Sequence, residues 1–225
     1  MKRRRRLPEI TKKLRLCAIG GSGWMGGAVL IPALNKGVIE EQNLVVANKS
    51  GQRHGFSEYP GVVVSTDVGE SVSECDAVLL SVRPGDFDGL CAGLSSGSHS
   101  GDKLDLSKHL VISFMAGITS QQIKEATGAK KIICCMPNAA AEISESFTPW
   151  LASAEVSPAE KKWVDDILQA AGKTYEVADE AAMAYFTALT GSSQGWMAYF
   201  ADSMQSAAEA NGVPSDVAES AVRQI

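Results

Sequence analysis

Gly21-Ser22-Gly23-Trp24-Met25-Gly26 is the stretch that decides the fold of this 225-residue chain. An apolar run over 14–19 leads into it, and the helix-compatible run 28–31 follows it. In the order strand, glycine turn, helix, the first glycine permits a tight turn, the second lets backbone N–H groups approach a pyrophosphate, and the third lets helix and strand pack closely. The anion would lie at the helix N-terminus, where unpaired N–H groups point. The stretch therefore predicts a dinucleotide-binding turn in which all six residues take part, with a plain glycine-rich turn as the alternative.

The residues after the second expected strand, 44–47, indicate which dinucleotide binds. An NAD site places an acidic residue there, about 20 residues after the glycines, to bind the ribose 2′-hydroxyl. This chain has Asn48-Lys49-Ser50, with Arg53 and His54 just beyond, and no carboxylate in that stretch. A lysine supplies positive charge and an arginine a bidentate fork, both suited to a 2′-phosphate. We therefore expect NADP(H) held by Asn48, Lys49, Ser50 and Arg53, with a solvated basic turn as the alternative.

Composition and charge exclude several classes of protein. The chain is 45% hydrophobic and 21% charged, which is typical of a cytosolic globular protein of one or two domains. Residues 1–15 contain eight basic side chains and one acidic side chain, which gives them a net charge of +7. Because the whole chain has a net charge of −5, the remaining residues carry −12. Such an acidic body argues against nucleic-acid binding. The arm 1–13 is expected to be disordered, and it resembles neither a secretory signal nor a transit peptide.

The remaining composition points to the cytoplasm. No apolar run approaches membrane-spanning length. Five cysteines without C-x-x-C spacing indicate a reducing compartment. The three histidines form no metal-ligand pattern, so no metal site is expected.

Short continuous apolar runs predict the fold class. They recur at 62–64, 77–80, 110–112 and 132–134, and continuous apolarity is typical of strands buried on both faces of a parallel sheet. Capping boxes beginning at Thr119 and Ser157 open two helices.

Near residue 179 the composition changes to two Ala- and Met-rich helical segments with few charges, 181–189 and 196–210, which are separated by Thr190-Gly191-Ser192-Ser193. We therefore expect an α/β Rossmann-type domain with a mostly parallel sheet over 14–178, and a small all-helical domain over 179–225 that looks incomplete. Its apolar helices are too short for a core of their own, which favours burial against a second copy in a homodimer.

The order of motifs resembles the Δ1-pyrroline-5-carboxylate reductase family from residue 14 to the end. Besides the glycine turn, the matching pieces are Ser81-Val82-Arg83-Pro84, Met115-Ala116-Gly117-Ile118, Met136-Pro137-Asn138 and Thr190-Gly191-Ser192-Ser193. The resemblance implies a reductase of proline biosynthesis that moves a hydride from NADPH to the carbon of a cyclic imine. An iminium carbon is electrophilic and reduced nicotinamide donates hydride directly, so the protein mainly has to position the two.

The resemblance also implies roles for individual residues. Further cofactor contacts are expected from Ser81, Arg83, Pro84, Ala116 and Gly117. Substrate contacts are expected from Met136, Pro137 and Asn138. A catalytic role is expected for Thr190, Ser192 and Tyr199, the last standing where many members place another hydroxyl.

Departures from the family pattern keep other readings open. Ala139-Ala140 and Gln194-Gly195-Trp196 stand where the family usually has Thr-Pro and Pro-Ala-Tyr, and the family's later Ser-Pro-Gly-Gly-Thr-Thr segment lies beyond Ile225. The departures leave three explanations: a different substrate, a shortened chain, or lost activity. The alternatives are a non-catalytic NADP-binding sensor or scaffold, and a reductase of a different imine or carbonyl. Gly191–Gly195 also matches the hydrolase elbow G-x-S-x-G, but the preceding segment is predicted to be helical and no histidine follows His109, so a hydrolase is not expected.

Overall fold

The computed structural model describes residues 14–93 and 103–225, and the basic arm 1–13 lies outside the described residues. The strands are β1 (Leu16–Ile19), β2 (Leu44–Ala47), β3 (Val63–Ser65), β4 (Ala77–Leu80), β5 (Leu110–Ser113), β6 (Lys131–Cys135), β7 (Ser146–Ala152) and β8 (Gly172–Glu176). The helices are α1 (Trp24–Asn35), α2 (Val68–Ser73), α3 (Phe87–Cys91), α4 (Ser120–Thr127), α5 (Pro158–Ala170), α6 (Glu180–Phe186), α7 (Ser193–Ala210) and α8 (Ser215–Arg223). Short helical turns are η1 (Glu41–Asn43), η2 (Pro84–Asp86), η3 (Ala139–Ile143) and the π-helical η4 (Thr187–Ser192).

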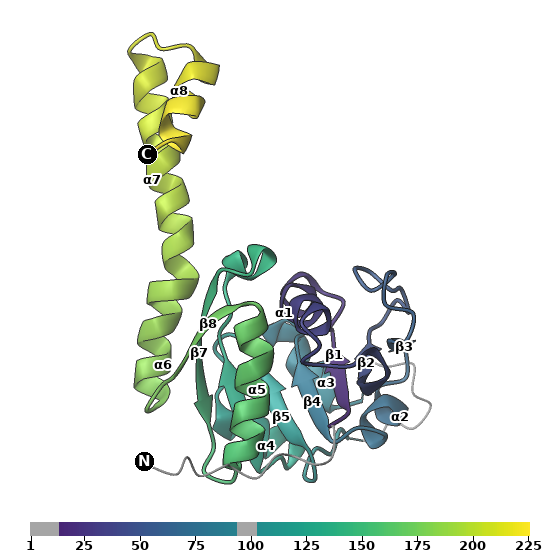
Figure 1. The fold of residues 1–225 in the computed structure, drawn as a ribbon. Coiled ribbons are helices and arrows are strands. Elements are labelled where there is room, and N and C mark those ends of the chain that lie inside the picture. Colours follow the sequence, from purple (N-terminus) through teal and green to yellow (C-terminus); the bar gives the residue numbers. More distant parts are fainter. Residues whose placement is uncertain (1–13, 94–102) are drawn as a thin grey trace, which may run out of the picture.

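One sheet organises the molecule, in the order β3-β2-β1-β4-β5-β6-β7-β8 (Figure 1). Neighbouring strands are parallel except β6 and β7, which run antiparallel. The predicted Rossmann-type, mostly parallel sheet is confirmed. Its first six strands coincide with the apolar runs of the sequence.

The core forms two layers because side chains alternate across a strand. In β1, Leu16 and Ala18 join a cluster that contains residues of α1 and α5, such as Leu30 and Leu168. Cys17 joins the opposite cluster, which contains residues of α2, α3 and α4. Both layers are made of side chains that are almost inaccessible to solvent. The helices therefore hold the strands, and with them the carboxyl ends of β1, β2 and β4, in a fixed frame.

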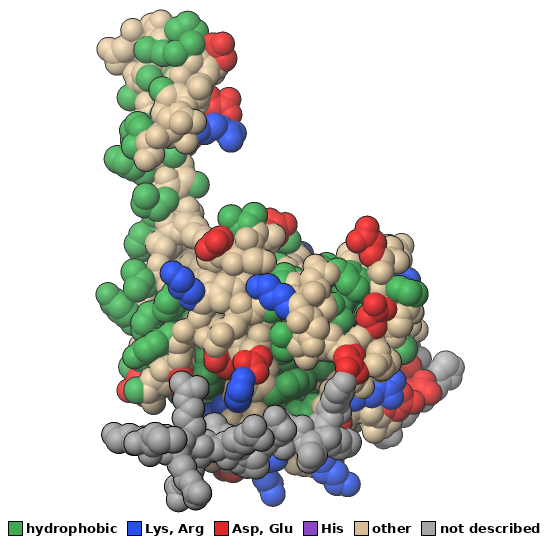
Figure 2. All heavy atoms as spheres, viewed as in Figure 1, with side chains coloured by type: hydrophobic (Ala, Val, Ile, Leu, Met, Phe, Trp, Pro, Cys, Tyr) green, Lys and Arg blue, Asp and Glu red, His purple; other side chains and the backbone are tan. Residues whose placement is uncertain are grey.

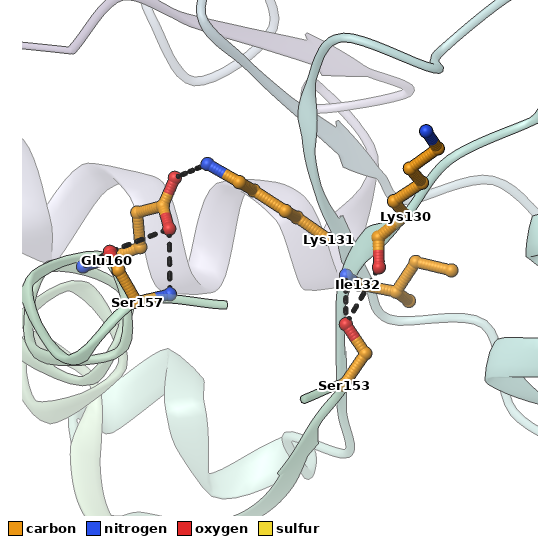
Figure 3. Close-up of polar contacts among 6 residues, drawn as sticks. All are labelled: Lys130, Lys131, Ile132, Ser153, Ser157 and Glu160. Carbon is orange, nitrogen blue, oxygen red and sulfur yellow. Dashed lines mark hydrogen bonds and ion pairs between the residues drawn. The ribbon is translucent and has the colours of Figure 1, made fainter. Parts of the chain in front are cut away.

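Both predicted capping boxes are present, and one of them ties helix α5 to the sheet (Figure 3). Glu160 Oε2 accepts from the backbone N–H of Ser157 at 2.8 Å, and its Oε1 lies 2.7 Å from Lys131 Nζ. Burial disfavours the charged form of Glu160, but hydrogen bonds from Lys131 and Ser157 outweigh it, so the pKa of this carboxyl lies below its usual value. Ser153 Oγ adds two hydrogen bonds at the start of β6, because it accepts from Ile132 N at 3.0 Å and donates to Lys130 O at 2.9 Å.

The helical region departs from the sequence-based expectation at one point. The stretch Thr190-Gly191-Ser192-Ser193 was expected to separate two helical segments, but helix continues through it as α6, η4 and α7. Two hydroxyl groups bond back to carbonyl groups of the preceding turn: Thr187 Oγ1 donates to Met183 O at 2.8 Å, and Ser193 Oγ donates to Leu189 O. Figure 1 shows α7 rising away from the sheet and α8 folding back along its far end.

Phe186 anchors the base of this helical region on the sheet. Its ring stacks on Phe147 of β7 with centroids 6.0 Å apart, and it meets Tyr175 of β8 at 5.6 Å. Ser120 Oγ, at the start of α4, donates to Glu180 Oε1 at 3.0 Å. Among the described residues, no helix is both long enough and apolar enough to cross a bilayer.

Candidate functional site

The glycine turn between β1 and α1 is built by close backbone approach. Gly20 has a φ of +74°, and its N–H donates to Ala47 O of β2 at 2.8 Å. A Cβ on Gly26 would lie 2.6 Å from Gly21 O, and one on Gly21 would lie 2.6 Å from the Ala18 Cβ. Only glycine at these positions lets α1 pack onto β1 in this way.

The N-terminus of α1 suits an anion. Its N-cap is Gly23, which places no side chain over the first turn, so no side-chain hydrogen bond caps the helix there. The first backbone N–H groups of a helix have no intrahelical partner, and the helix dipole adds positive charge at this end. The turn therefore fits the pyrophosphate of a dinucleotide.

A cavity of about 260 Å³ lies beside this turn, at the carboxyl ends of β1, β2 and β4. Its lining includes five of the residues predicted to bind cofactor, namely Ser22, Gly23, Asn48, Lys49 and Ser81. Thr66 and Asp86 also line it, and neither was predicted. Both follow a strand closely, so the rule that ligands bind at the carboxyl ends of parallel strands could have found them. Lys49 and Asp86 are the charged members of the lining.

The two cations that follow β2, Lys49 and Arg53, make different contacts. Asn48 Oδ1 accepts from the backbone N–H of Gly51 at 2.6 Å and of Ser50 at 3.1 Å, which folds the turn and leaves Lys49 exposed at the cavity. Arg53 instead directs Nη2 to the carbonyl oxygens of Tyr59 and Val62, each at 2.8 Å. The structure thus brings Lys49 to the cavity and uses Arg53 to brace the following loop.

The turns after β4 and β5 contribute to the same edge of the sheet. Ser81 N–H donates to Ile19 O at 2.9 Å, which holds it beside the glycine turn. Arg83 and Pro84 are exposed at the start of η2, and Ala116 and Gly117 are exposed after β5. These four residues lie outside the cavity lining, after the carboxyl ends of β4 and β5.

Asn138 and Thr190, which come from distant parts of the sequence, are in contact. Asn138 Nδ2 donates to the carbonyl oxygen of Thr190 at 3.0 Å. Pro137, just before Asn138, is buried, and the backbone N–H of Met136 donates to Pro149 O of β7 at 3.0 Å. The strand end 136–138 is therefore tied to β7 on one side and to η4 on the other.

Ser192 and Tyr199 lie farther out. Both are exposed, with Tyr199 at 75%, and they are separated by about two turns along one helix face. The residues lining the 260 Å³ cavity include none from α6, η4 or α7. Within one chain, then, the three predicted catalytic residues lie together on the helix but apart from the glycine turn.

Cys134 is a buried thiol near the carboxyl end of β6. Burial, with a smaller contribution from Glu180, raises the pKa of the Cys134 thiol to about 12, so this thiol stays protonated near neutral pH. In residues 14–93 and 103–225 no group of three or more His, Cys, Asp or Glu side chains could hold a metal ion. The hydrolase reading of Gly191–Gly195 is wrong, because helix α6 and the π-turn precede the serine where an elbow needs a strand.

Comparison with known proteins identifies relatives of both parts of the chain. Residues 15–117 match the family described as NADP oxidoreductase coenzyme F420-dependent, and residues 180–225 match the family described as pyrroline-5-carboxylate reductase dimerisation. A pyrroline-5-carboxylate reductase of Pasteurella multocida is 32% identical over 213 residues, which span 93% of this chain and 74% of that protein.

Solved structures agree with this. The 1-pyrroline-5-carboxylate reductase of Streptococcus pyogenes superposes with a TM-score of 0.76 at 26% identity, covering 94% of this chain and 76% of that one. The Plasmodium falciparum pyrroline carboxylate reductase, solved with NADP bound, gives a TM-score of 0.75 at 24% identity, covering 94% of this chain and 75% of that one. At that identity, the second likeness supports the fold alone.

Proposed function

Since the chain belongs to the pyrroline-5-carboxylate reductase family, oxidoreductases that act on a CH–NH group and use NADP(H), we propose that it reduces Δ1-pyrroline-5-carboxylate to proline. The observation that carries the proposal is the cavity at the carboxyl edge of the sheet. It is bounded by a glycine turn that admits no Cβ at its close approaches and by Lys49.

Named residues would hold the cofactor. The first backbone N–H groups of α1, freed by Gly23, would bind the pyrophosphate. Lys49 would bind the 2′-phosphate, with Ser50 and the turn built by Asn48 beside it. Ser81, at the end of β4, would border the rest of the molecule. When bound, NADPH supplies the hydride, and the residues that hold it determine which face meets the substrate.

The imine would be oriented by hydroxyl groups of the helical region. Thr190, Ser192 and Tyr199 offer three hydroxyls, and the ring nitrogen needs a hydrogen-bond partner as its charge changes during hydride transfer. Met136, Pro137 and Asn138 would border the nicotinamide and the imine from the sheet side. Few strong acids or bases are required for this reaction, because reduced nicotinamide donates hydride directly.

We propose that two copies form a homodimer through the helices after residue 179. The side chains that favour this are large, apolar and exposed: Tyr185 at 68%, Leu189 at 50%, Trp196 at 68%, Met197 at 68% and Phe200 at 61%. Figure 2 shows apolar side chains along the C-terminal helices, which rise from the sheet. Exposed apolar surface of this extent is typical of an interface, and the matched family is named for dimerisation.

A cytoplasmic location follows as part of the proposal. All five cysteines are free thiols and all are buried. Burial also raises the pKa of Cys91 to about 11. Unpaired thiols suit a reducing compartment.

The test is NADPH oxidation by the full chain with Δ1-pyrroline-5-carboxylate, followed by a panel of other cyclic imines. Tyr199→Phe should lower turnover at least several-fold without unfolding the protein, because it deletes one hydroxyl. Tyr185→Phe is the matched control, being a similarly exposed tyrosine of the preceding helix, and should retain wild-type turnover. Tight NADPH binding without turnover of any imine would favour a sensor or scaffold instead.

A further inference from the structure

Asn138 engages the helical region through both polar atoms of its side chain. Nδ2 donates to Thr190 O at 3.0 Å, while Oδ1 accepts from the backbone N–H of Ala140 at 3.1 Å and, over a longer 3.4 Å, from Gln194 Nε2. The residue is only 7% exposed. A buried amide with both polar atoms in use is held in one orientation, because losing a partner leaves it unsatisfied.

The sheet side of this contact is rigid. The backbone N–H of Asn138 donates to Ser146 Oγ at 3.2 Å, and Ser146 Oγ in turn lies 3.0 Å from Thr148 Oγ1. Both hydroxyl residues belong to β7 and are buried. Asn138 is therefore fixed to the sheet before it reaches the helix.

The helix side is a π-turn, an element that is rare and often found at functional sites. In it, Thr190 Oγ1 donates to Phe186 O at 2.9 Å. A hydroxyl has one proton and two acceptor lone pairs, so this threonine oxygen remains available as an acceptor. An acceptor is the group that suits the N–H of a protonated imine.

We propose that Asn138 is a positioning residue that locks η4 to the carboxyl edge of the sheet and so sets where Thr190 and Ser192 stand, with Gln194 as a second contact. Gln194 makes this contact from a position where the family usually has proline, which carries no side-chain donor. The effect on turnover rests on the proposed function. The effect on the turn does not.

Amide hydrogen exchange of the full chain tests the lock without any substrate. Asn138→Asp keeps the acceptor that caps Ala140 but replaces the donor to Thr190 O with an oxygen, and Gln194→Glu likewise removes the donor to Asn138. Exchange in segment 187–194 should become at least about tenfold faster in Asn138→Asp and less so in Gln194→Glu. Ser120→Ala is the matched control, because it deletes the Ser120–Glu180 bond at the base of α6 and should leave 187–194 unchanged.

Kinetics with the cyclic imine then separate positioning from general stability. Misplacing reacting groups by about 1 Å can lower the rate about a hundredfold. Asn138→Asp should therefore lower kcat between ten- and a hundredfold while the KM for NADPH stays close to wild type. Gln194→Glu should act in the same direction more weakly, and it serves as the reporter if Asn138→Asp does not fold.

Two results would overturn the proposal. One is wild-type exchange over 187–194 in both variants, and the other is faster exchange with unchanged kcat. If the wild-type protein reduces no imine, the proposed function fails separately, and the exchange measurements alone decide whether Asn138 locks the turn.

Discussion

The carbonyl oxygen of Gly21 lies 2.6 Å from the point where a Cβ on Gly26 would be. No real Cβ approaches a backbone oxygen so closely, and the oxygen cannot rotate aside as a flexible side chain could. The tightness of the turn is therefore a property of the fold itself, present before any ligand binds.

Gly26→Ala should destabilise the protein, because α1 would have to move away from β1. Overpacking of this kind costs about 1–3 kcal/mol of unfolding free energy. Thermal unfolding should show a melting temperature lower by roughly 2–4 °C for each kcal/mol in a chain of this size. An unchanged melting temperature would mean that the turn is looser than its geometry indicates.

Gly23→Val should remove cofactor binding and leave the fold intact. A Cβ on Gly23 meets only Gly20 O, at 3.1 Å, and its φ of −69° suits any residue. The added side chain would project over the first turn of α1, into the space assigned to the pyrophosphate. Calorimetric titration with NADPH should detect no binding, alongside a circular dichroism spectrum like that of the wild type.

Lys49→Ala should weaken NADPH binding about tenfold or more and leave NADH binding unchanged. A charge-assisted contact to a phosphate contributes roughly 1.5–3 kcal/mol. Arg53→Ala is the informative comparison, because its guanidinium is engaged by Tyr59 O and Val62 O. It should lower the melting temperature more than it alters the NADPH-to-NADH preference. If the preference depends on Arg53 and not on Lys49, the assignment of the 2′-phosphate site is wrong.

Trp196→Glu together with Phe200→Glu should convert a dimer to a monomer. Both side chains are more than 60% exposed on α7 in the single chain, so a charge there is tolerated by the monomer but not by an apolar interface. Light scattering should give twice 23.7 kDa for the wild type and 23.7 kDa for the variant. A wild-type protein that stays monomeric at micromolar concentration would contradict the proposed assembly.

Glu160→Gln should lose a pH-dependent part of the stability. The pKa of Glu160 is lower in the folded state, so its contribution is present above the unfolded pKa of about 4.3 and is lost as the pH falls through the folded value. Because Lys131 is 44% exposed, screening limits the ion pair to about 0.5–1 kcal/mol. Urea titrations at pH 7 and at pH 3 should show the variant less stable only at the higher pH.

The sequence was sufficient for the parts of the fold that rest on strong local patterns. Continuous apolar runs located the first six strands, and both capping boxes appear where Thr119 and Ser157 predicted them. Strands β7 and β8 were missed for physical reasons. Pro149 interrupts the first, and the second reads Gly-Lys-Thr-Tyr-Glu, a largely exposed edge strand without an apolar run.

The site was predictable in its location and less so in its contacts. The glycine turn and Lys49 line the cavity as expected. The sequence shows that Lys49 and Arg53 follow β2. It does not show that Arg53 donates to two carbonyl oxygens of the next loop, because that contact depends on the tertiary fold. The π-turn was not predicted, because Thr190-Gly191-Ser192-Ser193 was expected to separate two helical segments, whereas helix continues through it.

In mechanical terms the arm formed by α7 and α8 is a lever whose pivot is the ring of Phe186 between Phe147 and Tyr175 (Figure 1). The 18 residues of α7 span about 27 Å, so a rotation of about 10° at the pivot would displace the far end by about 5 Å. An ångström-scale adjustment among the side chains at the base is thus amplified several-fold at the tip. The position of α8 and of the far end of α7 therefore depends on a few aromatic and amide groups at the edge of the sheet.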